Sequence, residues 1–364
     1  MLIIEQLLLK PAAASSGPPA PSFFLYAWGK NNYGQLGTSQ VTNTYSWNVV
    51  STSDKHTLGI RSDGLLFVWG NNNYGQLGTT DTNPYQSPVQ IGASSWTAVS
   101  AGGYHSTAIR SDNKLFTWGR NNFGQLGTAN TTNYSSPVQI GASSWTAVSA
   151  GTTHTCAIRS DGALFSWGSN AQGQSGRGTT LYSWTSIGFG KYHAVGLRSD
   201  GLLFTWGRNN YGQLGTGNTT NYSSPVQIGT SSWTAIGVGW DHSVAVKSNG
   251  SLFAWGNNGF GQLGTGDAIS YSSPVQIGTS SWTAVSAGLY NTSAIRFGGS
   301  LFTWGRNLYG QLGDGSTLDN SSPVQIGTSS WTMVKSGSFH TAAIKFGGLL
   351  YAWINSFGFP NSLT

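Results

Sequence analysis

The stretch LFTWGRNNYGQLG occupies Leu203 to Gly215, and copies of its first half occur eight times in the 364-residue chain. The tryptophans of these copies are Trp28, Trp69, Trp118, Trp167, Trp206, Trp255, Trp304 and Trp353. Five of the seven intervals between them are 49 residues long, and the first and fourth are 41 and 39. A fixed period near this length predicts a propeller or a solenoid.

A second series of tryptophans supports the repeat. Its members are Trp47, Trp96, Trp145, Trp184, Trp233, Trp282 and Trp331, and each precedes the next tryptophan of the first series by 22 residues. The other half of the unit is shorter in the first and fourth units. A rigid unit keeps its length whereas a surface connection can lose residues, so the constant half is expected to be the core of each unit.

Each unit reads as four short strands. In the second unit they are Ser87–Ile91, Trp96–Ser100, His105–Arg110 and Leu115–Trp118, rich in β-branched and aromatic residues and bounded by turn formers. Four antiparallel strands repeated radially make a propeller blade. The glycines of GQLG, such as Gly212 and Gly215, suit a tight turn with positive φ or a close backbone approach.

The number of segments predicts the number of blades. Seven WT…H segments indicate an all-β, seven-bladed β-propeller of four-stranded antiparallel blades, with residues 23–364 in the propeller and 1–22 outside it. Eight LFxW strands leave one spare, so Phe24–Trp28 and Leu350–Trp353 are expected to close the ring with strands from both termini. The first and fourth connections lack a clear SPVQI segment, and those blades are expected to lose an outer strand or hold a degenerate one.

The units LFTWGRNNYGQLG, SSPVQI, WTAVSAG and HSTAIRSDN resemble the regulator of chromosome condensation repeat over about residues 24–358. The resemblance implies a seven-bladed propeller closed by both chain ends. It is specific for the fold and not for the function, because that family includes exchange factors for small GTPases, chromatin binders, ligase-associated modules and other binding propellers.

The composition indicates where the protein is expected to act. Charged residues make up 8% of the chain, against roughly 25% in ordinary soluble proteins, so Asn, Ser, Thr and Gln must supply most of the polar surface. Such surfaces are common on extracellular and virion-surface β-proteins. The net charge is +6, but the basic residues are spread at repeat intervals, which does not indicate nucleic-acid binding. No apolar run approaches the roughly 18 residues of a membrane span.

The first 22 residues lie outside the repeat and end in a Pro/Ala/Ser linker. Three interpretations are open: a disordered tail, a cleaved signal, or a short apolar anchor that docks on a partner. The residues of such an anchor would be Leu2, Ile3, Ile4, Leu7, Leu8 and Leu9.

Candidate binding residues fall into two sets. Trp240 lies outside both tryptophan series, and we place it at the position that Tyr104, Thr153, Tyr192, Tyr290 and Phe339 fill in other units, just before the histidine strand. These residues are expected to ring one face. The hairpin turns carry a cation in every unit, and an aspartate follows two residues later in four of them. Lys247, Arg296 and Lys345 lack that aspartate and would form a cationic arc that could meet an acidic partner or an anionic glycan.

Catalytic and metal sites are not indicated. All six histidines occupy one repeat position, where the remaining unit has Asn291, and one histidine per blade is too dispersed for a metal. They are expected to make hydrogen bonds instead. Cys156, the only cysteine, stands where other units have small residues and is expected to be buried. The sequence therefore predicts no enzyme, no cofactor and no metal.

The function predicted from these features is a structural and binding propeller. Its expected setting is an exposed virion component of a phage, such as a decoration, fibre or adhesin subunit, that joins a larger protein assembly through its N-terminal tail. Guanine-nucleotide exchange, chromatin binding and glycan binding are the competing hypotheses. The expected location is the virion surface or the extracellular space, with the cytoplasm as the second possibility.

Overall fold

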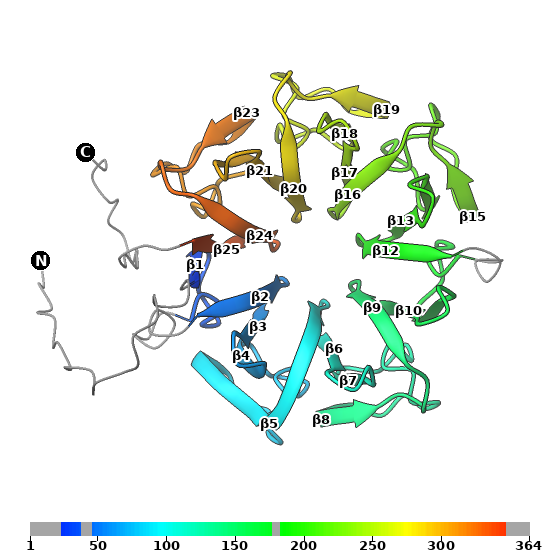
Figure 1. Ribbon diagram of the computed structural model, residues 1–364, viewed down its shortest axis with the longest axis vertical. Coiled ribbons are helices and arrows are strands. Elements are labelled where there is room, and N and C mark those ends of the chain that lie inside the picture. Colours follow the sequence, from blue (N-terminus) through cyan, green and yellow to red (C-terminus); the bar gives the residue numbers. More distant parts are fainter. Residues whose placement is uncertain (1–22, 38–45, 177–182, 347–364) are drawn as a thin grey trace, which may run out of the picture.

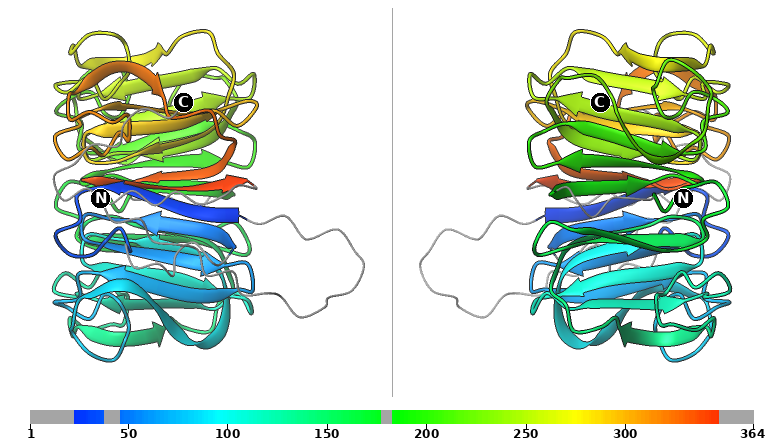
Figure 2. Two further views of the ribbon diagram at one scale, coloured as in Figure 1. Left: turned by 90° about the vertical axis from the view of Figure 1, so that its left-hand side faces the viewer. Right: turned by 90° about the vertical axis from the view of Figure 1, so that its right-hand side faces the viewer.

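The computed structural model describes residues 23–37, 46–176 and 183–346, and every element in these ranges is a β-strand. The strands form a ring of antiparallel sheets around a central axis (Figure 1). Seen from the edge, the ring is a disc with connections on both sides (Figure 2). The described part of the chain contains no helix long and apolar enough to cross a bilayer.

Seven blades follow one another around the ring, and we number them by their innermost strand. The innermost strands of blades 1 to 7 are β2 (Trp47–Thr52), the second half of β5 (Tyr85–Ala101), β9 (Trp145–Ala150), β12 (Trp184–Phe189), β16 (Trp233–Val238), β20 (Trp282–Ala287) and β24 (Trp331–Ser336). Each opens with a tryptophan of the second series. The 22-residue half-unit of the sequence is therefore the constant inner part of a blade.

The second strands open with the histidine or with Asn291. They are β3 (His56–Arg61), β6 (His105–Arg110), β10 (His154–Arg159), β13 (His193–Arg198), β17 (His242–Lys247), β21 (Asn291–Arg296) and β25 (His340–Phe346). The third strands carry the LFxW motif. They are β4 (Leu65–Gly70), β7 (Leu115–Gly119), β11 (Leu164–Gly168), β14 (Leu203–Gly207), β18 (Leu252–Gly256), β22 (Leu301–Gly305) and β1 (Phe23–Gly29).

The outer strands carry the SPVQ segment. They are the first half of β5, β8 (Tyr134–Gln139), β15 (Tyr222–Gln227), β19 (Tyr271–Gln276) and β23 (Asn320–Gln325). The two strands predicted at Ser87–Ile91 and Trp96–Ser100 are one continuous element, β5, which joins blades 1 and 2 into a seven-stranded sheet. The strands predicted at His105–Arg110 and Leu115–Trp118 are found as β6 and β7.

Blades 3 and 7 have three strands within the described ranges, β11-β10-β9 and β1-β25-β24. These blades include the LFxW strands that precede the two short connections, as the sequence predicts. β1 pairs with β25 from Phe23 opposite Phe346 to Gly29 opposite His340, at the edge where the LFxW strand lies in the other blades. Leu350–Trp353 lies outside the described residues, so a closing strand there stays a prediction.

The tryptophans form the core between blades. Trp206 is fully buried, and its Nε1 donates to the carbonyl oxygen of Gln174 in the preceding blade at 2.9 Å. Trp184, of the second series, packs edge-on against it with ring centroids 5.8 Å apart. The same pair recurs in other blades, for example Trp233 with Trp255 at 6.2 Å. Burying rings of roughly 150–250 Å² each makes this packing a major stabilising contribution.

The glycines of GQLG behave as predicted. Gly212 and Gly215 have φ of +78° and +74°. A Cβ on Gly215 would lie 2.8 Å from Nε1 of Trp255, and a Cβ on Gly212 would lie 2.4 Å from the Cα of Ser272. Only glycine meets both requirements, which explains why the motif recurs where the turn must approach the next blade.

Candidate functional site

The strand directions divide the connections between two faces. In an antiparallel blade, successive connections emerge on opposite sides. The connection before each second strand and the loop after each third strand therefore share one side, which we call the aromatic face. It carries the residue just before each histidine and the loops that contain the GQ pair. The opposite side carries the turns between second and third strands, and we call it the arginine-turn face.

A hydrogen-bonded turn holds each loop of the aromatic face. In blade 4 the side chain of Gln213 accepts a bond from the main-chain N–H of Tyr211 at 2.9 Å. The carbonyl of Gln213 accepts bonds from Trp255 Nε1 at 2.9 Å and from the Ser243 hydroxyl at 2.8 Å, both in the next blade. The loop that carries the aromatic residue two positions before the glutamine is thus hydrogen-bonded to the next blade.

Rings and cations alternate on this face in three equivalent groups, which we call triads. Between blades 1 and 2, Tyr74 packs edge-on against Tyr104 at 5.2 Å, and the guanidinium of Arg120 lies 5.0 Å from the first ring and 5.7 Å from the second. Each triad therefore takes a ring from one blade and both a ring and a cation from the next.

The other two triads repeat this arrangement. Phe260 and Tyr290 lie 4.9 Å apart beneath Arg306, and Tyr309 and Phe339 lie 5.3 Å apart beneath Lys30. A cation over an exposed ring contributes roughly 0.5–1 kcal/mol. These groups stiffen the loops while leaving aromatic and cationic surface accessible.

Three loop rings have no ring beside them among the described residues. Phe123 is 52% exposed, Tyr211 is 41% exposed and Tyr33 is 37% exposed. At their junctions, the residue before the histidine is Thr153, Asp241 and Lys55 in place of an aromatic residue. Exposed rings among cations are typical of contact surfaces.

The connections between first and second strands on this face carry both charges. Asp54, in blade 1, accepts a hydrogen bond from the Ser338 hydroxyl, and burial raises the pKa of its carboxyl to about 6 against the opposing effect of Lys55 and Lys191. Lys191, in blade 4, lies 4.2 Å from the ring of Trp240. Burial also raises the pKa of Asp241, opposed by Arg208 and Lys191.

The position predicted for Trp240 is wrong by one residue. His242 opens β17, so Asp241 and not Trp240 corresponds to Tyr104 and Tyr192. The error arose because GVGWDH has its aromatic residue one place early. Trp240 nevertheless lies near the predicted group, since its ring is 6.4 Å from that of Tyr290.

The predicted site residues separate into two groups. Tyr104, Tyr192, Tyr290, Phe339 and Trp240 belong to the aromatic face. Lys247, Arg296 and Lys345 end or nearly end the second strands and belong to the arginine-turn face. The structure does not bring the two groups together, and the predicted anchor, Leu2 to Leu9, lies outside the described residues.

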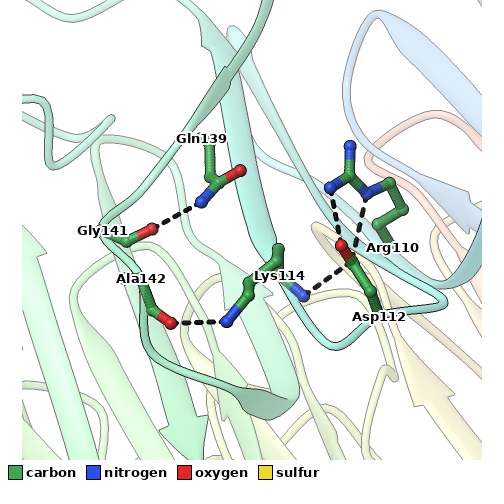
Figure 3. A network of polar contacts seen from close by, with 6 residues as sticks. All are labelled: Arg110, Asp112, Lys114, Gln139, Gly141 and Ala142. Carbon is green, nitrogen blue, oxygen red and sulfur yellow. Dashed lines mark hydrogen bonds and ion pairs between the residues drawn. The ribbon is translucent and has the colours of Figure 1, made fainter.

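Figure 3 shows one turn of the arginine-turn face. Asp112 accepts bonds from Arg110 Nε at 3.1 Å and from the main chain of Lys114 at 3.2 Å, and the Lys114 ammonium donates to the carbonyl of Ala142 at 2.5 Å. The bond from Arg110 lowers the pKa of Asp112 to about 2. Equivalent pairs join Arg61, Arg159 and Arg198 to the aspartate two residues on.

The cations of this face also contact rings, in the later units as in the earlier ones. The Lys247 ammonium lies 4.2 Å from the Phe253 ring, and the Arg296 guanidinium lies 5.3 Å from that of Phe302. The network of Figure 3 serves the turn itself, because its polar groups bind one another. This face also presents an exposed ring, since Phe297, in the turn after Arg296, is 80% exposed.

Five of the six histidines make side-chain hydrogen bonds, as predicted, and these bonds join one blade to the next, whereas neither ring nitrogen of His154 has a partner among the described residues. Nε2 of His105 lies 2.8 Å from the Thr155 hydroxyl, which itself donates to the carbonyl of Gln125 at 2.8 Å. Burial lowers the pKa of this histidine to about 3. A neutral ring that bonds to a hydroxyl is structural, and the described residues contain no group of three or more His, Cys, Asp or Glu arranged to hold a metal.

Sequence reasoning did not single out the cations of the aromatic face. Lys30, Arg120, Arg208 and Arg306 each stand two residues after an LFxW tryptophan, so their spacing was visible in the sequence. Their proximity to rings from the preceding blade was not visible. The cysteine prediction is confirmed, since Cys156 is fully buried and burial raises the pKa of its thiol.

Comparison with known families gives a match over most of the chain. The sequence profile described as the regulator of chromosome condensation (RCC1) repeat matches residues 24–57, 63–109, 112–158, 200–246, 249–295 and 298–344. A second profile of the same repeat, shifted in phase, matches 49–76, 96–125, 145–174, 184–213, 233–262 and 282–311. A search of curated proteins found no significant match.

Solved structures with a similar fold include two of the yeast protein Prp20 and one human protein. Prp20p of Saccharomyces cerevisiae, whose binding to Gsp1p and histones is described, shares 19% identity over 90% of this chain and 92% of its own, with a TM-score of 0.79. Yeast RCC1 (Prp20) bound to Kap60 shares 17% over 94% and 96%, with a TM-score of 0.80. Human WBSCR16 shares 20% over 90% and 99%, with a TM-score of 0.76. At these identities the likeness concerns the fold alone.

Proposed function

Because the chain belongs to the RCC1 repeat family, we propose that it is a binding propeller that recognises an acidic protein partner through its aromatic face. The observation that carries the proposal is the alternation of rings and cations on that face, with Phe123 and Tyr211 substantially exposed. The net charge of +6 adds a long-range attraction for an acidic partner. Binding by such a surface requires no catalytic group.

The proposal is tested by comparing the two faces. One variant, Phe123→Ala/Tyr211→Ala/Trp240→Ala, removes rings from the aromatic face, and a matched variant, Lys247→Ala/Arg296→Ala, removes cations from the arginine-turn face. Proteins captured by the immobilised wild type are identified, and each purified partner is titrated against both variants. We expect the first variant to lose affinity and the second to retain it. Loss confined to the second variant would reject the aromatic face.

A second candidate function is nucleotide exchange on a small GTPase, or histone binding. The fold likeness to Prp20p, with its described binding to Gsp1p and histones, favours it over glycan binding. The cations of the aromatic face fit an acidic partner better than a basic histone, and the described loops are of similar length with no inserted segment. A nucleotide-release assay with small GTPases would identify exchange activity.

The predicted setting remains a proposal that rests on composition. A low-charge polar surface and an apolar N-terminal stretch fit an exposed virion subunit anchored by residues 1–22, at a virion or extracellular surface. Deleting residues 1–22 and measuring incorporation into particles tests this setting. Surface glycan binding is addressed by a glycan array, where binding lost on Trp240→Ala would favour it.

We also propose that β1 from the N-terminal part and β24 and β25 from the C-terminal part together close the ring. The pairing of β1 with β25 supports this, as does the loop after β1. There the carbonyl of Gln35 accepts bonds from Trp69 Nε1 and from the Thr57 hydroxyl, both at 2.9 Å.

A further inference from the structure

A fourth group on the aromatic face, between blades 3 and 4, has the cation and one ring of a triad but not the second ring. The Arg208 guanidinium lies 5.4 Å from the Tyr192 ring, as Arg120 lies over Tyr104 in the first triad. The loop position that supplies the other ring in the three triads is held here by Gln172. A hollow of about 460 Å³ opens at this point, lined by Ala171, Gln172, Tyr192, Arg208 and Asn210.

The backbone that would present the second ring is unchanged. The main-chain N–H of Gln172 donates to the side chain of Gln174 at 2.8 Å, as that of Tyr211 does to Gln213 at 2.9 Å in the next loop. The hollow therefore results from the side chain at position 172 and not from a different loop. The three complete triads show what fits beside a ring and a cation in this geometry, namely a ring at 4.9 to 5.3 Å.

We infer that this hollow binds an aromatic side chain of an acidic partner segment, inserted where the three triads hold a ring of the chain itself. The inference deepens the proposed function and rests on it. A phenyl or phenol ring would lie edge-on to Tyr192 and beneath Arg208. Residues beside it would meet the positive charges of Arg208 and Lys191, which flank Tyr192. Asp241 offsets part of the charge of both cations, and Asp54 offsets part of that of Lys191.

Neighbouring features extend the site along the ring. Phe123 in blade 2 and Tyr211 in blade 4 lie in the loops on either side of the hollow's own loop, and both are exposed. Trp240 follows in blade 5, with Lys191 against it. A partner segment that crosses blades 2 to 5 would meet accessible rings on both sides of the hollow, whereas the triads of blades 5 to 7 have already paired theirs.

The test uses acetyl-Asp-Tyr-Asp-amide as the probe and saturation-transfer difference NMR on the full chain. The controls are acetyl-Asp-Ala-Asp-amide and acetyl-Lys-Tyr-Lys-amide. We expect saturation of the tyrosine ring of the first peptide and little transfer to either control. No transfer to the first peptide, or equal transfer to the alanine peptide, would overturn the inference.

Three variants locate the binding. Gln172→Tyr should supply the missing ring from within, abolish transfer and leave the melting temperature equal or higher. Gln172→Ala keeps the hollow and should keep binding. Phe260→Gln should open an equivalent hollow beside Tyr290 and Arg306 and raise the stoichiometry from one site to two. Binding unchanged by Gln172→Tyr would place the peptide elsewhere and contradict the inference.

The two proposals fail separately. If the aromatic-face variants lose their protein partner while Gln172→Tyr keeps both partner and peptide, the binding face stands and the aromatic hollow is wrong. If Gln172→Tyr loses the peptide while the partner binds both face variants alike, the hollow stands and the proposed function of the face is wrong.

Discussion

The histidines show how a single residue type joins the blades. In five of the six cases, all but His154, a hydroxyl of the next blade faces Nε2 of the histidine and donates its own proton to a glutamine carbonyl, so Nε2 must be the donor to that hydroxyl. In blade 4, Nε2 of His193 lies 2.9 Å from Ser243 Oγ, which donates to the carbonyl of Gln213. Nδ1 has no hydrogen-bond partner among the described residues in five of the histidines, whereas that of His56 lies 2.9 Å from Ser53 Oγ. A proton added to Nδ1 would place a charge on a fully buried ring.

This arrangement predicts acid lability. Burial lowers the pKa of His56, His105, His154, His193 and His242 to about 3, and that of His340 to about 4, from 6.5. The unfolded chain therefore binds more protons below pH 6.5. Stability is complete above that pH and falls as the pH drops toward 4, by up to about 1.4 kcal/mol per pH unit for each histidine. Urea denaturation between pH 8 and pH 4 would measure it, and a flat profile would contradict it.

Asn291 offers the matched substitution. It takes the histidine position in blade 6, and neither atom of its amide has a hydrogen-bond partner in the described part of the chain. Asn291→His should bond to the Thr341 hydroxyl, which already donates to the carbonyl of Gln311. We expect a gain of about 0.5–1.5 kcal/mol at pH 8 and a steeper loss below pH 6.5. The reverse change, His105→Asn, should lower stability at pH 8 and make the profile shallower.

For single residues, the sequence predicted the role of a side chain where the same position recurs in every unit. The histidines could be assigned to hydrogen bonding because all six share a register that Asn291 completes. Trp240 was misplaced because its unit has Asp241 directly before the histidine, and the aromatic residue comes one position earlier. The role of Gln172 was not visible, because a missing ring has meaning only beside Tyr192 and Arg208, which come from the next blade.

At the scale of the element, the loop after each third strand sets the distance between blades. Its last glycine lies against the tryptophan of the next blade, and its glutamine carbonyl accepts a hydrogen bond from the indole N–H of that tryptophan. In blades 4 and 5 these are Gly215 against Trp255 and Gln213 bonded to Trp255. The loop therefore belongs structurally to two blades, although the sequence period assigns it to one.

A pair of glycine substitutions separates backbone strain from close contact. Gly215 has φ of +74° and a Cβ there would lie 2.8 Å from Trp255 Nε1, whereas Gly229 has φ of +60° and no atom within 4 Å of an added Cβ. Gly229→Ala should cost about 1–2 kcal/mol from the left-handed conformation alone. Gly215→Ala should cost about 1–3 kcal/mol more, because Trp255 must move. Chemical denaturation of both variants gives the difference, and equal costs would show that the contact does not matter.

Most elements could be predicted because each is short, bounded by turn formers and repeated. The exceptions lie between blades. β5 runs without a break from Tyr85 to Ala101, and within it Ser95 pairs with Leu65. In the other units that have an outer strand, the strand ends at the equivalent link. Local sequence cannot predict this continuity, because the GASSW link of blade 1 is the same as that of blade 2, where the strand ends at Gln139.

For the whole molecule, the repeat determines the arrangement of the blades in a ring but does not determine which part of the ring binds a partner. Equivalent positions converge on one face in every blade, so departures from the repeat distinguish one arc from another. Three junctions form complete triads, and the junctions around blades 3 and 4 leave rings or ring positions unpaired. The binding surface that we propose therefore follows from the irregular units, which a search for the consensus passes over.

Closure of the ring depends on which terminal strand pairs with β25. Leu25–Trp28 and Leu350–Trp353 have the same sequence, LYAW, and either could in principle take that place. β1 is followed by Gln35, whose carbonyl bonds to Trp69 and Thr57, and the sequence INSFGFPN after Trp353 has no glutamine. Deleting residues 1–37 should therefore leave an open edge on β25, lower the melting temperature by about 10 °C or more and promote aggregation.

Two shorter deletions serve as controls for that experiment. Removing residues 1–22 leaves β1 intact, and removing residues 347–364 leaves β25 paired with β1. Both should keep the melting temperature of the full chain, because neither takes away a strand that pairs with β25. A large loss on removing 347–364, with little loss on removing 1–37, would assign the edge of β25 to the C-terminal copy. The ring would then be closed by a local hairpin, and the chain ends would no longer hold each other.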